Sequence, residues 1–149
     1  MKVIRFKLSQ WDFITPINEI QEIVQGLTLY RLPLTKPWLL GACHLRGNIF
    51  PVTDLLTFIT LKKRIEMKQH LLLFNQNDWL FGLAVSDIKG MIDIEINDIN
   101  QTPDYPKELT RLSGCFGGIT LYENESHYLF HPEKLINIPE FMLSFDANA

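Results

Sequence analysis

Cysteine and histidine side chains are the candidate metal ligands and nucleophiles of this sequence: Cys43, His44, Cys115, His127 and His131. Cys43 and His44 are neighbours on a predicted strand, so their side chains point to opposite faces. On an extended chain, His127 and His131 would lie about 13 Å apart, too far to bind one ion. Neither a Cys-x-x-Cys nor a His-Glu-x-x-His pattern occurs. The spacing therefore predicts neither a metal site nor a bound cofactor.

Catalytic motifs are absent from the sequence as well. It has no Gly-x-Ser-x-Gly nucleophile elbow, and Gly117-Gly118 is not followed by the Gly-Lys-Ser/Thr of a phosphate loop. Cys115 lies among glycines, where it is either an exposed thiol or a small buried hydrophobe. A binding protein is therefore predicted. A small β-barrel enzyme that uses Cys115, or a generic protein-binding barrel, is the alternative.

Composition and charge argue against nucleic acid and anionic lipid as general binding partners. The chain has 149 residues, a net charge of -3 and a pI of about 5.8. General binding to nucleic acid or to anionic lipid requires a basic face, which this balance does not favour. No apolar run approaches the roughly 20 residues that span a bilayer, and the first residues do not resemble a signal peptide. We expect a cytoplasmic protein that neither binds nucleic acid nor inserts into the membrane.

Hydrophobic periodicity is mostly that of strands. Alternation or apolar runs bounded by turn residues predict strands at 3–8, 11–14, 70–74, 79–85, 92–96 and 127–130. Short helices are expected at 53–59 and from Pro132 onwards, where proline suits the first helical position, while 18–24 is either a helical turn or an irregular strand. Many short strands separated by turns favour an all-β barrel or sandwich.

Two features suggest that the chain has two related parts. The charged stretch 62–69 is the best internal divider. On either side of it, a glycine (Gly41 or Gly114) leads into apolar strands and then into a proline-containing segment before a short helix. Two β subdomains, with strands possibly exchanged between them, would produce this faint repeat.

The most informative segment is 39–55, which reads as strand, tight turn, strand and helix cap. Gly47-Asn48 suits the left-handed backbone of a tight turn. Pro51 is expected at a strand edge or end. Arg46 is a lone charge beside the turn.

This segment resembles the signature of the CheW family of chemotaxis adaptors, in which a glycine and a Leu-Arg-Gly turn lead into Pro-Val-x-Asp-Leu. Further stretches that resemble the family lie at 11–24, 82–88, 112–114 and 133–136. His44 and Ser86 replace the asparagine and aspartate that are frequent in the family. Together with the short N-terminus, they look more like the PilI branch of type IV pilus (twitching) systems.

The resemblance implies a fold and a role. The fold would be a single CheW-like domain over residues 1–149, made of two packed SH3-like five-stranded barrels with short helices. The role would be a non-catalytic adaptor without cofactors. Its partners would be the cytoplasmic tip of a receptor and the regulatory domain of a CheA-type histidine kinase, so it would be recruited to membrane receptor arrays.

Arg46 is the first candidate for partner binding. A guanidinium group at an exposed turn suits a partner's carboxylate or carbonyl groups. An internal ion pair with Asp54 or Glu22 is the alternative, and the two roles are compatible.

Four other residues complete the predicted partner surface. By resemblance, Ile20 and Glu22 lie where such adaptors meet receptor tips; core packing is the alternative for Ile20, and an idle surface charge for Glu22. Val85 is a candidate only because it lies in the strand at 82–88 that resembles the family. Burial in the core is the alternative for this residue. Trp38 is either an interface anchor or a lid over the first barrel's core.

Overall fold

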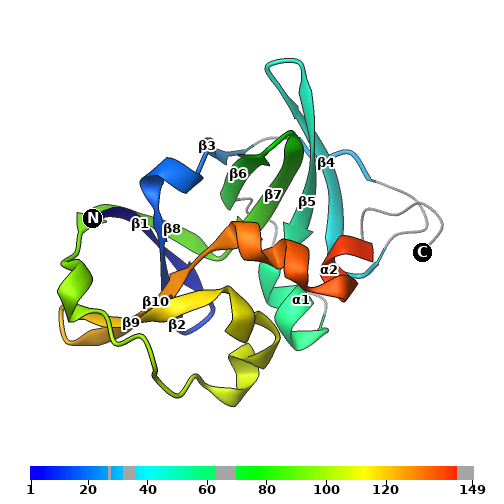
Figure 1. Cartoon of the computed structure of the whole chain (residues 1–149). Coiled ribbons are helices and arrows are strands. Elements are labelled where there is room, and N and C mark those ends of the chain that lie inside the picture. The colour runs from blue at the N-terminus through cyan, green and yellow to red at the C-terminus, as the bar shows by residue number, and fades with distance from the viewer. Residues whose placement is uncertain (27, 32–35, 63–69, 144–149) are drawn as a thin grey trace.

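The computed structural model describes residues 1–26, 28–31, 36–62 and 70–143. These residues form two five-stranded sheets with short helices packed between and beside them (Figure 1). The predicted charged divider falls largely at 63–69, outside the described residues.

The first sheet has the strand order β8-β1-β2-β10-β9. Its strands are β1 (Lys2–Leu8), β2 (Trp11–Pro16), β8 (Asp87–Asp93), β9 (Phe116–Tyr122) and β10 (Glu125–Phe130). The hairpin of β1 and β2 turns at Ser9-Gln10, as predicted, and β10 lies parallel to β2 while the other pairs are antiparallel.

The second sheet has the strand order β3-β6-β7-β5-β4. Its strands are β3 (Glu22–Gln25), β4 (Leu39–Leu45), β5 (Asn48–Asp54), β6 (His70–Gln76) and β7 (Trp79–Val85). Here β6 and β7 form the predicted hairpin, and β5 lies parallel to β7.

The two sheets repeat one arrangement, with an exchange of strands. The hairpin β1-β2 corresponds to β6-β7, the edge strand β8 to β3, and the pair β10-β9 to β5-β4. Strands β3, β4 and β5 follow the first hairpin in the sequence but belong to the sheet of the second hairpin. Strands β8, β9 and β10 follow the second hairpin but belong to the sheet of the first. Each sheet therefore contains strands from both halves of the chain, and a cut at 62–69 would divide both sheets.

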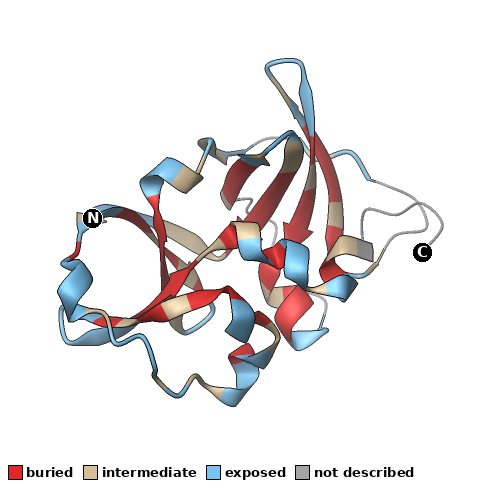
Figure 2. Cartoon of the chain, in the orientation of Figure 1, coloured by how far each residue is buried: buried red, intermediate tan, exposed pale blue. Residues whose placement is uncertain are grey.

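In the part of the chain that the structure describes, the buried apolar side chains form three clusters. The largest contains residues of both sheets, including Phe13 of β2 and Phe81 of β7, so it lies where the sheets pack on each other. A smaller cluster around Phe50 and Val52 belongs to the second sheet, and another around Val3 and Ile14 belongs to the first. Buried residues accordingly follow the strands (Figure 2). The predicted all-β fold of two five-stranded barrels with short helices is confirmed.

The helices are short. They are η1 (Ile17–Glu19), α1 (Leu55–Thr60), η2 (Ile96–Asp98), η3 (Lys107–Cys115), η4 (Pro132–Asn137) and α2 (Pro139–Leu143), of which those labelled η are 3₁₀ helices. The expected helix near 53–59 is present as α1, with Asp54 at its N-cap position. Pro132 begins η4 as predicted, and 18–24 contains both a helical turn and a strand.

The strand predicted at 92–96 lies earlier in the sequence than expected. β8 ends at Asp93, which is opposite Lys2, and Ile94 then donates its N–H to the Met1 carbonyl. The isoleucine alternation continues past this point, although the pairing of β8 with β1 does not. After Ile94 the chain leaves the sheet and forms η2.

The glycine repeat also needs one correction. Gly114 lies within η3, not at the start of a strand. The residue of β9 that corresponds to Gly41 of β4 is Gly118. Both have positive φ angles, +149° for Gly41 and +130° for Gly118. Each is followed by a residue that bonds a crossing segment, Ala42 to Tyr30 and Ile119 to Asn100.

Candidate functional site

The β4-β5 hairpin projects from the second sheet and is exposed at its tip (Figures 1 and 2). Leu45 pairs with Asn48, so the two turn residues are Arg46 and Gly47, one position earlier than predicted. Their φ angles, 51° and 80°, are both positive, as a tight two-residue hairpin turn requires. Pro51 lies within β5 at a position paired with β4 only, because pairing with β7 begins at the next residue.

Arg46 forms an ion pair with Glu22 of β3. The guanidinium Nη2 lies 2.8 Å from the Glu22 Oε1, and the two side chains are 75% and 25% exposed. Because β3 and β4 are opposite edges of their sheet, this pair links the hairpin tip to the far edge and helps close the barrel. Asp54, the other predicted partner, is buried and accepts a hydrogen bond from Thr57.

The remaining predicted contact residues lie deeper. Ile20, between η1 and β3, is partly buried against the large cluster. Val85 and Trp38 are members of that cluster, and the Trp38 ring packs edge-on to Phe58. Arg46 and Glu22 are thus brought together at the surface, whereas Val85 and Trp38 are not part of it.

Sequence reasoning missed three surface residues, two on the hairpin and one beside it. His44 and Ile49 are opposite each other on β4 and β5, and the Tyr30 ring lies 5.9 Å from the His44 ring. Tyr30 and Ile49 are exposed although they are apolar. Alternation along 42–45 and 48–51 would have marked His44 and Ile49 as outward-facing. Nothing local would have placed Tyr30 there.

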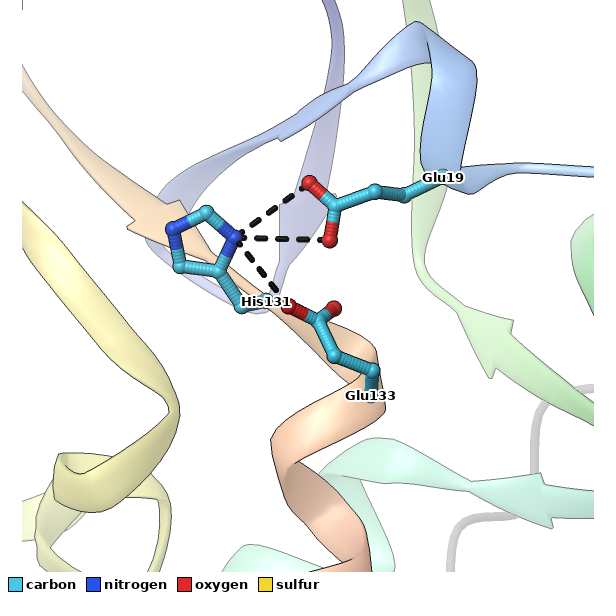
Figure 3. Close-up of side chains that lie close together, drawn as sticks. All are labelled: Glu19, His131 and Glu133. Atoms are coloured by element: carbon cyan, nitrogen blue, oxygen red, sulfur yellow. Dashed lines mark hydrogen bonds and ion pairs between the residues drawn. The ribbon is translucent and has the colours of Figure 1, made fainter. Parts of the chain in front are cut away.

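A second group of polar side chains joins the two halves of the chain (Figure 3). Glu19, at the end of η1, meets His131 and Glu133, at the start of η4. The His131 Nδ1 lies 3.3 Å from the Glu19 Oε2 and 3.7 Å from the Glu133 Oε1. Among the described residues, this is the group of three ligand-type side chains close enough to share an ion.

The three groups shift one another's pKa values. Burial, and next the Glu19 carboxylate, raise the pKa of Glu133 to about 7. The hydrogen bond with Glu19 raises the pKa of His131, although burial opposes it. Burial also acts to raise the pKa of Glu19, but the bonds with His131 and Glu133 prevail and lower it. At neutral pH the group therefore shares protons among two carboxylates and one imidazole.

Sequence spacing could not reveal this group. Glu19 and His131 are 112 residues apart, and they meet because β2 and β10 are parallel neighbours, so the segments that follow these strands lie at the same end of the sheet. The one local signal was a histidine two residues before a glutamate at a predicted helix start.

Neither cysteine is placed as a nucleophile. Both side chains are fully buried, and burial, with the nearby Glu133 charge, raises the pKa of the Cys115 thiol to about 12. Burial also raises the pKa of Cys43. Since the thiolate is the reactive species, the structure gives no support to the Cys115 enzyme alternative.

The folded protein should therefore resist thiol reagents. We expect both cysteines to react with iodoacetamide at least about 100-fold more slowly than in urea, because the thiolate is scarce and the sulfur is inaccessible. Mass spectrometry of the labelled peptides measures both rates. Rapid labelling of native Cys115 would restore the nucleophile hypothesis.

Among the described residues, no helix combines the length and the hydropathy needed to cross a lipid bilayer.

Comparison with known proteins shows one consistent family. The sequence model of the protein family described as the CheW-like domain matches residues 2–140. The chemotaxis protein CheW of Helicobacter pylori is 30% identical over 70% of this chain, and the protein PilI of Pseudomonas aeruginosa is 25% identical over 66%. These alignments cover 64% and 56% of the two relatives, so the chain spans less than two thirds of their length.

A solved structure agrees in fold. The scaffolding protein TtCheW from Thermoanaerobacter tengcongensis superimposes with a TM-score of 0.77 over 93% of each chain, at 22% sequence identity.

Proposed function

Because this chain belongs to the family of CheW-like domains, we propose that it is a non-catalytic adaptor that couples the cytoplasmic tip of a methyl-accepting receptor to the regulatory domain of a CheA-type histidine kinase. It would work in the cytoplasm, recruited to receptor arrays at the membrane. Relatives named chemotaxis protein CheW, and a structural neighbour named a scaffolding protein, support this role. Similarity to PilI supports a place in type IV pilus twitching motility.

One observation connects the proposal to particular residues: Arg46 is exposed at the tip of the projecting hairpin, where it forms an ion pair with the partly buried Glu22 of β3. An arginine that is three-quarters exposed retains donors for a partner while one nitrogen is bonded to Glu22. On the same hairpin, Ile49 is exposed opposite His44, and the exposed Tyr30 ring lies 5.9 Å from the His44 ring, so both offer apolar contact. An arginine next to aromatic and aliphatic side chains is typical of the centre of a protein interface.

Reversal of the charge at Arg46 tests the proposal. We expect Arg46→Glu to weaken binding to the receptor tip or to the kinase regulatory domain at least about 10-fold, since a buried interfacial arginine is often worth more than about 1.4 kcal/mol. Unfolding free energy should fall by less than about 1 kcal/mol, because the Arg46–Glu22 pair is exposed to solvent. Biolayer interferometry with each immobilised partner from the same organism measures affinity, and urea denaturation measures stability.

A charge swap separates the two roles of Arg46. The double variant Arg46→Glu/Glu22→Arg restores an ion pair with its signs exchanged. If the pair acts only within the protein, the swap restores binding; if Arg46 contacts the partner, it does not. Lys89→Glu, which breaks the exposed pair with Asp87 on β8, is the matched control. Absence of binding to both partners by the folded unmodified protein would overturn the adaptor proposal.

A further inference from the structure

The group of Glu19, His131 and Glu133 has the separations of a metal-ligand set. Two ligand atoms bound at about 2.0–2.1 Å in a tetrahedral zinc site lie roughly 3.4 Å apart. The His131 Nδ1 is 3.3 Å and 3.7 Å from the nearer oxygens of the two glutamates. All three ligand atoms lie within 4.8 Å of one another, and each residue is partly buried. Small side-chain rotations would bring them to coordinating distance.

The charges of the group are incompletely balanced by the protein. Two carboxylates converge on a single imidazole, and Glu19 and Glu133 lie close enough to share a hydrogen bond when one of them carries a proton. Lys134 acts on the group electrostatically but is not within ion-pair distance of it in the described structure. Two carboxylates this close to each other do not both stay ionised without a counter-charge, so either a proton or a bound cation neutralises the group.

The backbone holds the imidazole in place. The His131 N–H donates to the Cys115 carbonyl at 2.8 Å. The far side of the ring lies against Gly117 of β9, where an added Cβ would come within 2.8 Å of the Nε2. The Nδ1 is thereby directed at the carboxylates, and such prior orientation of a ligand favours metal binding.

We infer that Glu19, His131 and Glu133 form a binding site for a transition-metal dication of the Zn²⁺ type, with at least one coordination position left to water. One nitrogen and two carboxylate oxygens favour such an ion over Mg²⁺, which prefers oxygen ligands and keeps its waters. The ion would tie η1, where the chain crosses between the sheets, to the start of η4. This inference does not depend on the proposed adaptor function, and it departs from the sequence-based expectation of no metal site.

Calorimetric titration of the chelator-treated full chain with Zn²⁺ tests the site. We expect one equivalent to bind, with Mg²⁺ at the same concentration giving no saturable signal. His131→Ala and Glu19→Gln should each lower the Zn²⁺ affinity about 100-fold or more, because each removes a direct ligand. His44→Ala, at a histidine outside the group, is the control and should leave the affinity unchanged. Circular dichroism melts establish that each variant is folded.

Two further measurements test whether the metal binds through His131 and Glu133. Zn²⁺ affinity should fall from pH 8 to pH 6, because protons on His131 and Glu133 compete with the metal; Glu19, Lys134 and Cys115 are the other titratable groups that bear on them. Bound Co²⁺ should give visible absorption that Glu133→Gln abolishes. Lack of saturable Zn²⁺ binding, or binding that His131→Ala and Glu19→Gln both leave unchanged, would overturn the inference.

Discussion

Alanine at Gly41 or at Gly118 is expected to lower the free energy of unfolding by about 3 kcal/mol in each case. Both positions have φ angles that residues with a side chain rarely adopt. A Cβ at Gly41 would collide with the carbonyl oxygen of Tyr30, and one at Gly118 with the carbonyl oxygen of Asn100. These are backbone atoms in paired segments, so they cannot move without loss of the bonds to Ala42 and Ile119.

Gly114→Ala is the matched control. Nothing lies within 4 Å of its added Cβ, and its φ is unexceptional, so its unfolding free energy should change by less than about 0.5 kcal/mol. Urea denaturation followed by tryptophan fluorescence measures all three variants. A cost below about 1 kcal/mol at both Gly41 and Gly118 would contradict the close approach of the crossing segments.

Local patterns in the sequence predicted the hairpins well. The alternation at 3–8 and the runs at 70–74 and 79–85 became β1, β6 and β7, because a strand's period and a polar turn are local properties. What they could not predict is which strand each hairpin pairs with. β3 pairs with β6 through Glu22 and Leu73, and nothing in either strand specifies so distant a neighbour. The two-barrel fold itself followed from the resemblance, not from periodicity.

The candidate site was predictable in part. Arg46 and Glu22 were both singled out, and their ion pair was one of two alternatives weighed. Val85 and Trp38 illustrate the limit of pattern reasoning. The run 79–85 is apolar on both faces, so periodicity could not tell a buried valine from an exposed one. A tryptophan in a loop packs or protrudes according to neighbours such as Phe58 that lie far along the chain.

Truncation of Phe13 is expected to have the largest effect on stability. Its ring lies 5.4–5.9 Å from those of Phe6, Phe116, Phe130 and Tyr128, inside the cluster that both sheets share. Phe13→Ala should lower the unfolding free energy by about 4 kcal/mol, through lost burial and the cavity that remains. The thermal midpoint should fall by roughly 10 °C for a chain of this size.

The form of the transition matters as much as its midpoint. Because Phe13 belongs to the first sheet and packs in a cluster that includes Phe81 of the second, its loss should weaken both sheets together, in one transition with an unchanged denaturant slope. Phe13→Leu, which keeps most of the apolar volume, is the control and should cost less than half as much. Two separate transitions, one for each sheet, would show that the shared cluster does not couple them. A single transition would show that the shared cluster makes the two barrels unfold as one cooperative unit.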